Sequence, residues 1–433
     1  MLTRVLFLLF ILLLLPDAYI YMTYVRKWTT CWWKRALFFV PSLALLIYLF
    51  VVLSQDDFRA VHQPMVGTLM MVFLTITVPK MLFTLFDCAG MASGKLAVRV
   101  KPGGPHDNAE GRASKELLGA TVRRYVRLFA MALGLCSVFM ILYGYFWGRN
   151  RYEVNEQEIY FEHLPSSFDG YRILHFSDLH IGTFDDGHRS DVNTIAQLIN
   201  NQKCDMVVFT GDIVNYEAAE LKGYEKALRS IKAKDGVFSV MGNHDYDMYL
   251  PFDSEAEKKA DIEQIKSAER SYGWTLLLNE NRVIRRGNDS IAVIGSENDG
   301  LPPWPALGDL PKATKGLKGL ERSDSTKGQP HTFSVLLTHD PTHWRRNVLP
   351  ETRIDLTLAG HTHAGQFKVL GWSPIRHKYR EWSGIYTEGE QVLNVTDGIG
   401  QILLPFRFGA WPEADVIVLK KYINENHDTE DTL

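Results

Sequence analysis

Four long apolar stretches occupy the first third of the chain and constrain its fold more than any other feature. They run over residues 5–25, 36–53, 65–86 and 128–147. Each approaches the ~17–25 residues that a helix needs to cross a bilayer, and four in succession exceed what a soluble core uses. A cleaved signal peptide is disfavoured, because Arg4 is the only leading charge and no small-residue cleavage site follows. The sequence therefore predicts a transmembrane anchor of four helices over residues 1–147.

Charge divides the chain at the same place. Residues 1–147 hold 15 Lys/Arg and 7 Asp/Glu, a balance of +8, whereas residues 148–433 hold 32 and 43, a balance of −11. This split indicates an anchor joined to a water-soluble domain. The acidic part argues against nucleic acid as a partner, since nucleic-acid binding needs a basic surface. The four cysteines form no CxxC motif, which excludes disulfide-rich modules and cysteine-ligated zinc fingers.

Basic residues in the short loops predict the orientation of the spans. The first loop carries four Lys/Arg, the second only Arg59, and the third seven. Because basic loops stay in the cytoplasm, the first and third loops are expected there. The chain is thus predicted to be a multi-pass protein of the plasma (inner) membrane, with its C-terminal domain on the extracytoplasmic side. The lipid bilayer is its first expected partner.

Two of the predicted spans carry a charge, Asp17 in the first and Lys80 in the third. A charge in hydrocarbon is costly unless it is paired or hydrated. Both spans would cross the bilayer in the same direction, with the two charges at similar depth. We therefore expect an Asp17–Lys80 ion pair, with a transport pathway as the weaker alternative.

Short strands alternate with helices over the rest of the chain. Strands are expected at residues 171–176, 206–210, 237–241, 291–296, 333–338, 356–359 and 392–396, and helices at 189–202, 218–232 and 254–272. This alternation predicts an α/β domain with its chemistry at the carboxyl ends of the strands. Residues 148–170 are expected to be a linker leading into this domain, residues 171–422 the domain, and residues 423–433 a disordered tail.

Polar clusters follow five of the predicted strands. In chain order they are SDLH at 177–180, GD at 211–212, GNHD at 242–245, HD at 339–340 and GHTH at 360–363. Each alone is weak evidence, but the ordered set supplies carboxylates, imidazoles and an amide without a thiol, which suits Mn, Fe or Zn. Two such ions ~3.5–4 Å apart would clamp a phosphate and activate a bridging water.

The spacing inside the clusters agrees with this interpretation. On an extended segment residues i and i+2 point to the same side, so Asp178 and His180 can bind one ion. His361 and His363 share this spacing and could each reach one of two neighbouring ions. Asp212 can bridge both ions with its carboxylate.

The set D-x-H, G-D, G-N-H-D, H and G-H-x-H resembles the calcineurin-like metallophosphoesterase superfamily, over residues 171–419. The strings SDLHIG, GDIVN, GNHDY and LAGHTHAGQ resemble its membrane-associated bacterial branch. The resemblance implies an α/β four-layer sandwich of two mixed β-sheets flanked by helices. It also implies a metal-dependent hydrolase of phosphoric ester or pyrophosphate bonds.

The resemblance further implies a role for each cluster. One divalent cation would be held by Asp178, His180, Asp212 and His363. The other would be held by Asp212, Asn243, His339 and His361. His244 would protonate the leaving oxygen during in-line attack by a metal-bridging hydroxide.

One position departs from the phosphoprotein phosphatase branch of this superfamily. Three residues after the bridging Asp, that branch has a second Asp that orients the catalytic His, whereas this chain has Asn215. This departure argues against a His–Asp dyad and against a protein phosphatase. Asp245, next to His244, is expected to brace its turn.

Attachment to the bilayer concentrates membrane-borne molecules, so a lipid-linked or envelope phosphate is the expected substrate. Phosphates of soluble nucleotides or of the cell wall are the alternative in the same class, and a non-catalytic membrane sensor is the alternative in another class. The basic run Arg376, Lys378 and Arg380 either binds substrate phosphate or is a solvated surface run. Arg407 is interpreted as structural.

Overall fold

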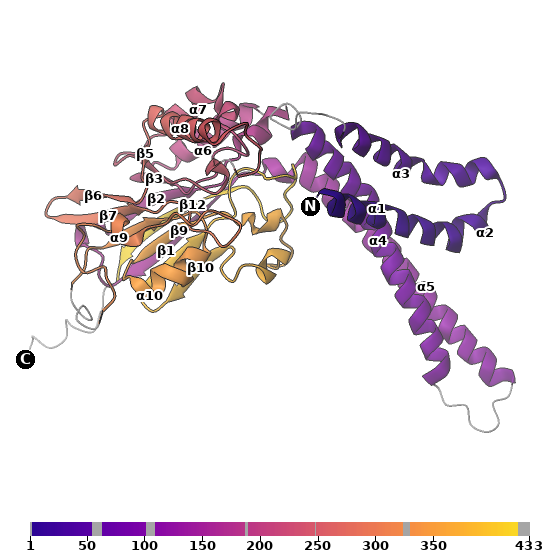
Figure 1. Cartoon of the computed structure of the whole chain (residues 1–433). Coiled ribbons are helices and arrows are strands. Elements are labelled where there is room, and N and C mark those ends of the chain that lie inside the picture. The colour runs from indigo at the N-terminus through magenta and orange to yellow at the C-terminus, as the bar shows by residue number, and fades with distance from the viewer. Residues whose placement is uncertain are drawn as a thin grey trace, which may run out of the picture. The chain divides into compact units, whose positions relative to one another are not determined.

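The structure is a computed structural model that describes residues 2–53, 63–100, 109–186, 189–246, 248–323 and 330–422. The chain divides into two compact units, Met1–Asp57 with Met65–Phe146, and Phe58–Pro64 with Trp147–Leu433 (Figure 1). The expected tail at 423–433 lies outside the described residues.

The first unit is helical. Its helices are α1 (Leu2–Ile20), α2 (Arg26–Trp28), α3 (Trp32–Leu53), α4 (Gln63–Val100) and α5 (Ala109–Phe146). Four segments are long and apolar enough to cross a membrane, namely Leu8–Trp28, Trp32–Val52, Met65–Gly94 and Glu116–Asn150. They overlap the four predicted spans. A helix satisfies its backbone polar groups internally, which is the condition for lying in hydrocarbon.

Two buried carboxylates of these helices, Asp17 and Asp87, lie beside cations. Lys80 Nζ lies 2.7 Å from Asp17 Oδ1 and 3.0 Å from Ser42 Oγ, which confirms the predicted contact. A second pair was not predicted: Asp87, seven residues after Lys80 on α4, accepts a hydrogen bond from Arg127 Nε at 3.2 Å. Tyr19 also donates to Asp87, at 2.8 Å. Each buried carboxylate in this unit thus has a cation beside it.

The second unit contains two six-stranded sheets among its described residues. The first has the order β1-β12-β2-β3-β4-β5. Its strands are β1 (Glu153–Phe161), β2 (Tyr171–Phe176), β3 (Met206–Phe209), β4 (Val237–Ser239), β5 (Thr275–Leu276) and β12 (Glu413–Lys421). The second sheet has the order β10-β11-β9-β8-β7-β6. Its strands are β6 (Glu280–Arg286), β7 (Asp289–Gly295), β8 (Ser334–Leu337), β9 (Leu356–Ala359), β10 (Gly384–Glu388) and β11 (Gln391–Val395).

Alternate residues of these strands fill different layers. Ile173 and Val208 face the interior between the sheets, where they join Val335 and Leu358 in one core. Neighbouring positions face outward. Those of the first sheet pack under α6 (Arg189–Asn201), α7 (Glu225–Ser230) and α8 (Glu255–Ser271), which Figure 1 shows together on one side. Those of the second sheet pack with Trp344, beside α9 (Leu310–Ala313) and α10 (Leu349–Glu351). The predicted four-layer α/β sandwich is confirmed.

Two local predictions need correction. The helix expected at 218–232 is broken into a short 3-10 turn, Ala218–Leu221, and α7, because Gly223 between them has φ +91°. Residues 148–170, expected as a linker, contain β1, which pairs with β12 over its full length. The strand was missed because its sequence, EVNEQEIYF, is mostly polar.

Candidate metal centre and active site

The five polar clusters meet at one edge of the sandwich. In the first sheet Asp178 and His180 follow β2, Asp212 follows β3, and Asn243 and His244 follow β4. In the second sheet His339 follows β8, and His361 and His363 follow β9. Because β2, β3 and β4 are parallel, as are β8 and β9, their carboxyl ends lie at the same edge of each sheet. The structure therefore brings together all eight predicted site residues.

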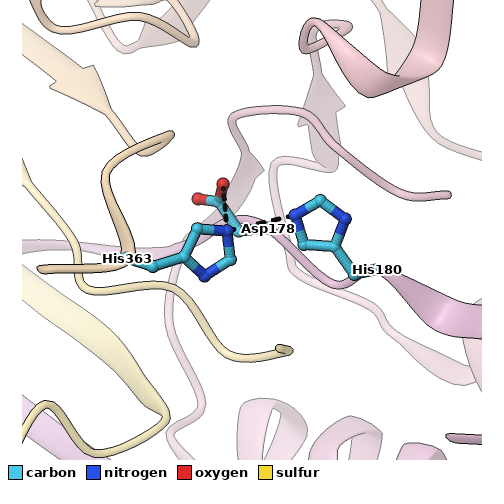
Figure 2. A group of neighbouring side chains, drawn as sticks. All are labelled: Asp178, His180 and His363. Carbon is cyan, nitrogen blue, oxygen red and sulfur yellow. Dashed lines mark hydrogen bonds and ion pairs between the residues drawn. The ribbon is translucent and has the colours of Figure 1, made fainter. Parts of the chain in front are cut away.

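One group of donors is formed by Asp178, His180 and His363 (Figure 2). His363 Nε2 lies 3.2 Å from Asp178 Oδ1 and 3.1 Å from His180 Nε2. Asp212 Oδ2 lies 3.6 Å from His180 Nε2. The atoms that face one another are those expected to bind the first cation.

A second group is formed by Asp212, His339 and His361. His339 Nε2 lies 3.1 Å from Asp212 Oδ2, 3.1 Å from Asn243 Oδ1 and 3.3 Å from His361 Nδ1. His339 Nδ1 is bound to the carbonyl oxygen of Thr210 at 2.8 Å, which leaves Nε2 to face the site. Asp212 Oδ2 thus belongs to both groups.

The charges of the site fit divalent cations. Burial disfavours the ionised form of Asp212, but the imidazoles of His339 and His244 outweigh burial and hold the pKa of its carboxyl below the usual range. Burial likewise disfavours a charged His339, but Asp212 dominates and raises the pKa of His339 to about 10. The carboxylates thus draw a positive charge into a fully buried site. A divalent cation could supply that charge in place of the proton, and the neutral imidazole would then be available as a ligand.

The backbone of the site is strained. Asp178, His180, Asp212, His361 and His363 have φ between +45° and +73°, in the left-handed region. The residues come together as predicted. The prediction that they point to one side of an extended segment is wrong, because these segments are not extended. Tight left-handed turns direct the side chains inward instead. Strain of this kind, on the order of 1–3 kcal/mol per residue, is characteristic of functional sites.

His244 is held by a backbone carbonyl. Its Nδ1 lies 2.6 Å from the oxygen of Asn215, and its own backbone N–H donates to Asp212 Oδ1 at 2.8 Å. Its ring stacks on Tyr249, with centroids 4.1 Å apart. A histidine at this position therefore needs no aspartate three residues after Asp212.

Two buried carboxylates brace the loops. Asp245 accepts backbone N–H groups of Gly242, Asp212 and Ile213, each at 2.8 Å, as its expected bracing role requires. Glu220 accepts the N–H groups of Asn215 at 2.7 Å and Gly182 at 3.2 Å. Glu220 was missed because it lies outside every motif, in a segment predicted to be helical.

An open pocket of about 200 Å³ leads to the donor groups. Its lining comprises Asp212, Asn243, His244, Tyr249, Trp304, His361, Thr362, His363, Ile375, Lys378, Tyr379 and Ile402. Of the basic residues Arg376, Lys378 and Arg380, only Lys378 is in this lining; Arg380 pairs with Glu381 at 3.6 Å. The sequence offered no signal for Trp304, which falls in a loop without periodicity.

One wall of this pocket is aromatic and carries the lysine. Lys378 Nζ lies 4.0 Å from the ring centroid of Trp304, a cation–π contact. Trp304 Nε1 donates to the Tyr249 hydroxyl at 2.8 Å, and Asn243 Nδ2 donates to the same oxygen at 2.7 Å. A hydroxyl accepts two hydrogen bonds and donates one, so the proton of Tyr249 remains to be donated. The contact also turns Asn243 Oδ1 toward His339.

Arg407 is fully buried beside the first donor group. Its guanidinium donates to the carbonyl oxygens of Gly400 at 2.6 Å and Asp397 at 2.8 Å, and Nη2 lies 3.1 Å from His363 Nδ1. These bonds join the loop before β12 to the metal centre. The structural role predicted for Arg407 agrees with them.

Comparisons with known proteins agree with this arrangement. Residues 171–365 match the family Calcineurin-like phosphoesterase, and residues 3–149 match the family Probable Calcineurin-like phosphoesterase, transmembrane domain. The chain is 29% identical over 280 residues to the uncharacterized metallophosphoesterase YkuE of Bacillus subtilis, covering 62% of this chain and 85% of that protein.

A vertebrate relative is similar over both units. The Danio rerio protein named transmembrane protein with metallophosphoesterase domain is 28% identical over 449 residues, covering 97% of this chain and 90% of the relative. Among solved structures, phosphopantetheinyl hydrolase of Mycobacterium tuberculosis is similar with a TM-score of 0.30 and 10% identity, covering 54% of this chain and 90% of that one. The chain thus contains a calcineurin-like phosphoesterase domain, which identifies it as a hydrolase of phosphoric esters, and the transmembrane domain that its second family describes.

Proposed function

We propose that this protein is a membrane-anchored dinuclear phosphohydrolase that cleaves a phosphoester or pyrophosphate bond of a lipid-linked or envelope substrate. The observation that carries the proposal is the position of Asp212. Its Oδ2 lies 3.1 Å from His339 Nε2 and 3.6 Å from His180 Nε2, so one carboxylate oxygen is shared by two donor groups. A shared carboxylate is what a two-metal site requires.

The eight site residues divide into metal ligands and an acid. The first cation is assigned to Asp178, His180, Asp212 and His363. The second is assigned to Asp212, Asn243, His339 and His361. The cations, which are Mn, Fe or Zn, supply Lewis acidity and an activated water when bound.

His244 acts on the leaving group. Because its Nδ1 is held by Asn215, its Nε2 is left for a proton that passes to the leaving oxygen. Tyr249 and Lys378 line the same pocket and position the phosphate, the first through its free hydroxyl proton and the second through its charge. The positive charge of Lys378 lies in the same pocket as the proposed cations, toward the pocket mouth. A substrate with a second anionic group is therefore favoured.

The membrane spans support a membrane-borne substrate, since an enzyme fixed in the bilayer meets lipid phosphates at high local concentration. The excess of Lys/Arg in the first and third loops supports an extracytoplasmic catalytic domain. Alkaline phosphatase and green fluorescent protein fused after residue 422 test this topology. An active phosphatase with dark fluorescent protein is expected, and the reverse pattern would place the domain in the cytoplasm.

The activity is tested with the full-length protein in nanodiscs, loaded in turn with Mn, Fe or Zn. The substrates are a monoester, a diester and a lipid pyrophosphate. We expect metal-dependent turnover that is lost in Asp212→Ala together with bound metal, and lost in His244→Ala with metal retained. Asp253→Ala, which removes an exposed carboxylate outside the site, is the matched control. Turnover that persists in Asp212→Ala would overturn the proposal.

A further inference from the structure

Two loops of the catalytic unit present leucines to solvent in a backbone conformation that leucine disfavours. Leu370 is 102% exposed with φ +49°, and Leu403 is 56% exposed with φ +60°. A left-handed backbone is costly for any residue with a Cβ, and an exposed apolar side chain gains nothing from burial. Leu370 and Leu403 each combine a left-handed backbone with an exposed apolar side chain, and both features are unfavourable in water. Their occurrence together at two residues indicates that another apolar surface covers these side chains.

The two loops form one unit. Val369 and Trp372 exchange backbone hydrogen bonds of 2.9 and 3.0 Å, so Leu370 is at the tip of a two-residue hairpin. The side chain of Gln366 binds the backbone of Ile402 on the other loop, through Nε2 at 3.0 Å and Oε1 at 2.8 Å. We name Leu370, Trp372 and Leu403 the leucine rim.

The leucine rim borders the catalytic pocket. Ile375 follows Trp372 by three residues, Ile402 precedes Leu403, and both isoleucines line the pocket with His244. An apolar surface thus continues from the rim toward the metal centre. Arg376 is exposed beside the hairpin and adds positive charge there.

The second loop is also bound to the chain segment that follows α5. Gln401 Nε2 donates to the carbonyl oxygen of Arg149 at 3.1 Å, and the Arg151 guanidinium lies 4.7 Å from the ring centroid of Trp411. Arg149 follows Phe146, the last residue of α5, by three positions. Three residues span at most ~10 Å, so the carbonyl group that Gln401 binds lies within that length of chain from the last residue of α5.

We propose that the leucine rim inserts into the interfacial layer of the lipid bilayer. Exposed leucines carry the apolar contact, Trp372 (41% exposed) suits the headgroup level, and Arg376 suits anionic lipid. The insertion opens the pocket toward the membrane, so that a lipid phosphate reaches it without leaving the bilayer. This second step rests on the proposed function, whereas the insertion itself does not.

Insertion is tested by fluorescence on the full-length protein in nanodiscs. The four native cysteines are replaced, and Leu370→Cys is labelled with the environment-sensitive dye NBD. Val283→Cys, at an exposed apolar residue of β6, is the matched control. We expect doxyl-labelled lipid to quench the dye at 370 and not at 283. Equal quenching at both positions would overturn the proposal. A dye spectrum at 370 that depends on protein concentration and not on doxyl lipid would also overturn it, and would indicate that a second copy of the chain covers the leucine rim.

Delivery is tested with the double variant Leu370→Asn/Leu403→Asn. Asparagine tolerates positive φ, so the melting temperature is expected to stay level or rise. The rate on a lipid phosphate in the same nanodiscs should fall about tenfold, with p-nitrophenyl phosphate hydrolysis unchanged. Equal rates on the lipid would overturn delivery. If the wild-type protein hydrolyses neither substrate, the proposed function fails, while the fluorescence result still decides insertion.

Discussion

The carbonyl oxygen of Asn215 lies 2.6 Å from Nδ1 of His244 and takes the place of the aspartate that orients this histidine in the protein phosphatases. The side chain of Asn215 is used elsewhere: its Nδ2 donates to the carbonyl oxygen of His180 at 3.3 Å and to Glu220 Oε2 at 3.2 Å. A backbone atom thus orients the proposed acid, and the side chain joins two catalytic loops.

Because the backbone of Asn215 contacts His244 while its side chain contacts other groups, two variants should differ in which property they change. Asn215→Asp should leave the turnover number within about threefold, because the carbonyl is retained, but it should lower the melting temperature, because a carboxylate then faces Glu220. His244→Ala should lower the turnover of an alkyl phosphate by roughly 10²–10⁴-fold. Steady-state kinetics and thermal melts of both variants check this. A large gain in rate from Asn215→Asp would show that the side chain orients His244 after all.

The pH dependence of the rate should differ between leaving groups. Burial lowers the pKa of His244 below 6.5, although the Asp212 carboxylate opposes the shift. An acid must be protonated to act, so turnover of an alkyl phosphate should fall as the pH rises through this lowered pKa. The p-nitrophenolate group of p-nitrophenyl phosphate leaves without a proton, so turnover of this substrate should not fall over the same pH range. The rate of His244→Ala should also lack this fall. Identical profiles for both substrates would contradict the assignment of His244.

Lys378 should discriminate between substrates by charge. Lys378→Met removes the ammonium over Trp304 and should raise the KM of a diphosphate ester about tenfold, with KM of the matching monophosphate nearly unchanged. Arg380→Met, from the same basic run but outside the pocket lining, is the control. Initial rates over a range of both substrates give the comparison. Equal increases for the two esters would mean that Lys378 does not contact a second anionic group.

Stability should depend on pH through Glu269. This side chain is fully buried, and the Ser239 hydroxyl is the polar side chain beside it. Burial, and then the charge of Asp245, raise the pKa of Glu269 from 4.5 to about 8. Between these values the folded state holds a proton that the unfolded state has lost, so the unfolding free energy falls as the pH rises.

Glu269→Gln should remove this dependence. The amide has the shape of the protonated carboxyl and does not ionise, so the variant should be the more stable protein at pH 8, by on the order of a few kcal/mol, with little difference at pH 4.5. Melting curves at several pH values measure the difference. A wild-type-like decline in Glu269→Gln would place the titrating group elsewhere.

The Asp17–Lys80 pair should behave as a unit. Asp17→Asn or Lys80→Met alone leaves one charge uncompensated in the helical unit and should lower folded yield and melting temperature in detergent. The double variant should recover much of both losses. If the two losses simply add, the contact seen at 2.7 Å makes no coupling contribution to stability.

The sequence predicted most of this site because its residues stand directly after strands of strong pattern. Tyr171–Phe176 and Leu356–Ala359 are apolar and lie in the structure at the predicted residues. Their position directly after β2 and β9 then places Asp178 and His361 at the same edge of the sandwich. Their left-handed backbone was not predictable, since Asp and His adopt this conformation more often than most residues but still only in a small minority of cases.

Other parts of the site have no local signal. Trp304 and Tyr249 are brought together by a hydrogen bond between residues 55 positions apart, and neither belongs to a repeating pattern. The sequence shows that Asn215 replaces the aspartate of the protein phosphatases. Every residue has a backbone carbonyl group, however, so its contact with His244 could be seen only in the structure. The same applies to Glu220, whose partners are backbone N–H groups.

The position of β12 has a consequence for the biosynthesis of this protein. The strand is the last element in the described chain, yet it lies between β1 and β2, pairing parallel with the first and antiparallel with the second. Long-range pairing of this kind forms late, after the ribosome has released both partners. The helices of the anchor can enter the bilayer long before that. The first sheet of the catalytic unit therefore closes only after the anchor helices have been synthesised, and a chain that stops before Glu413 lacks the strand that joins β1 to β2.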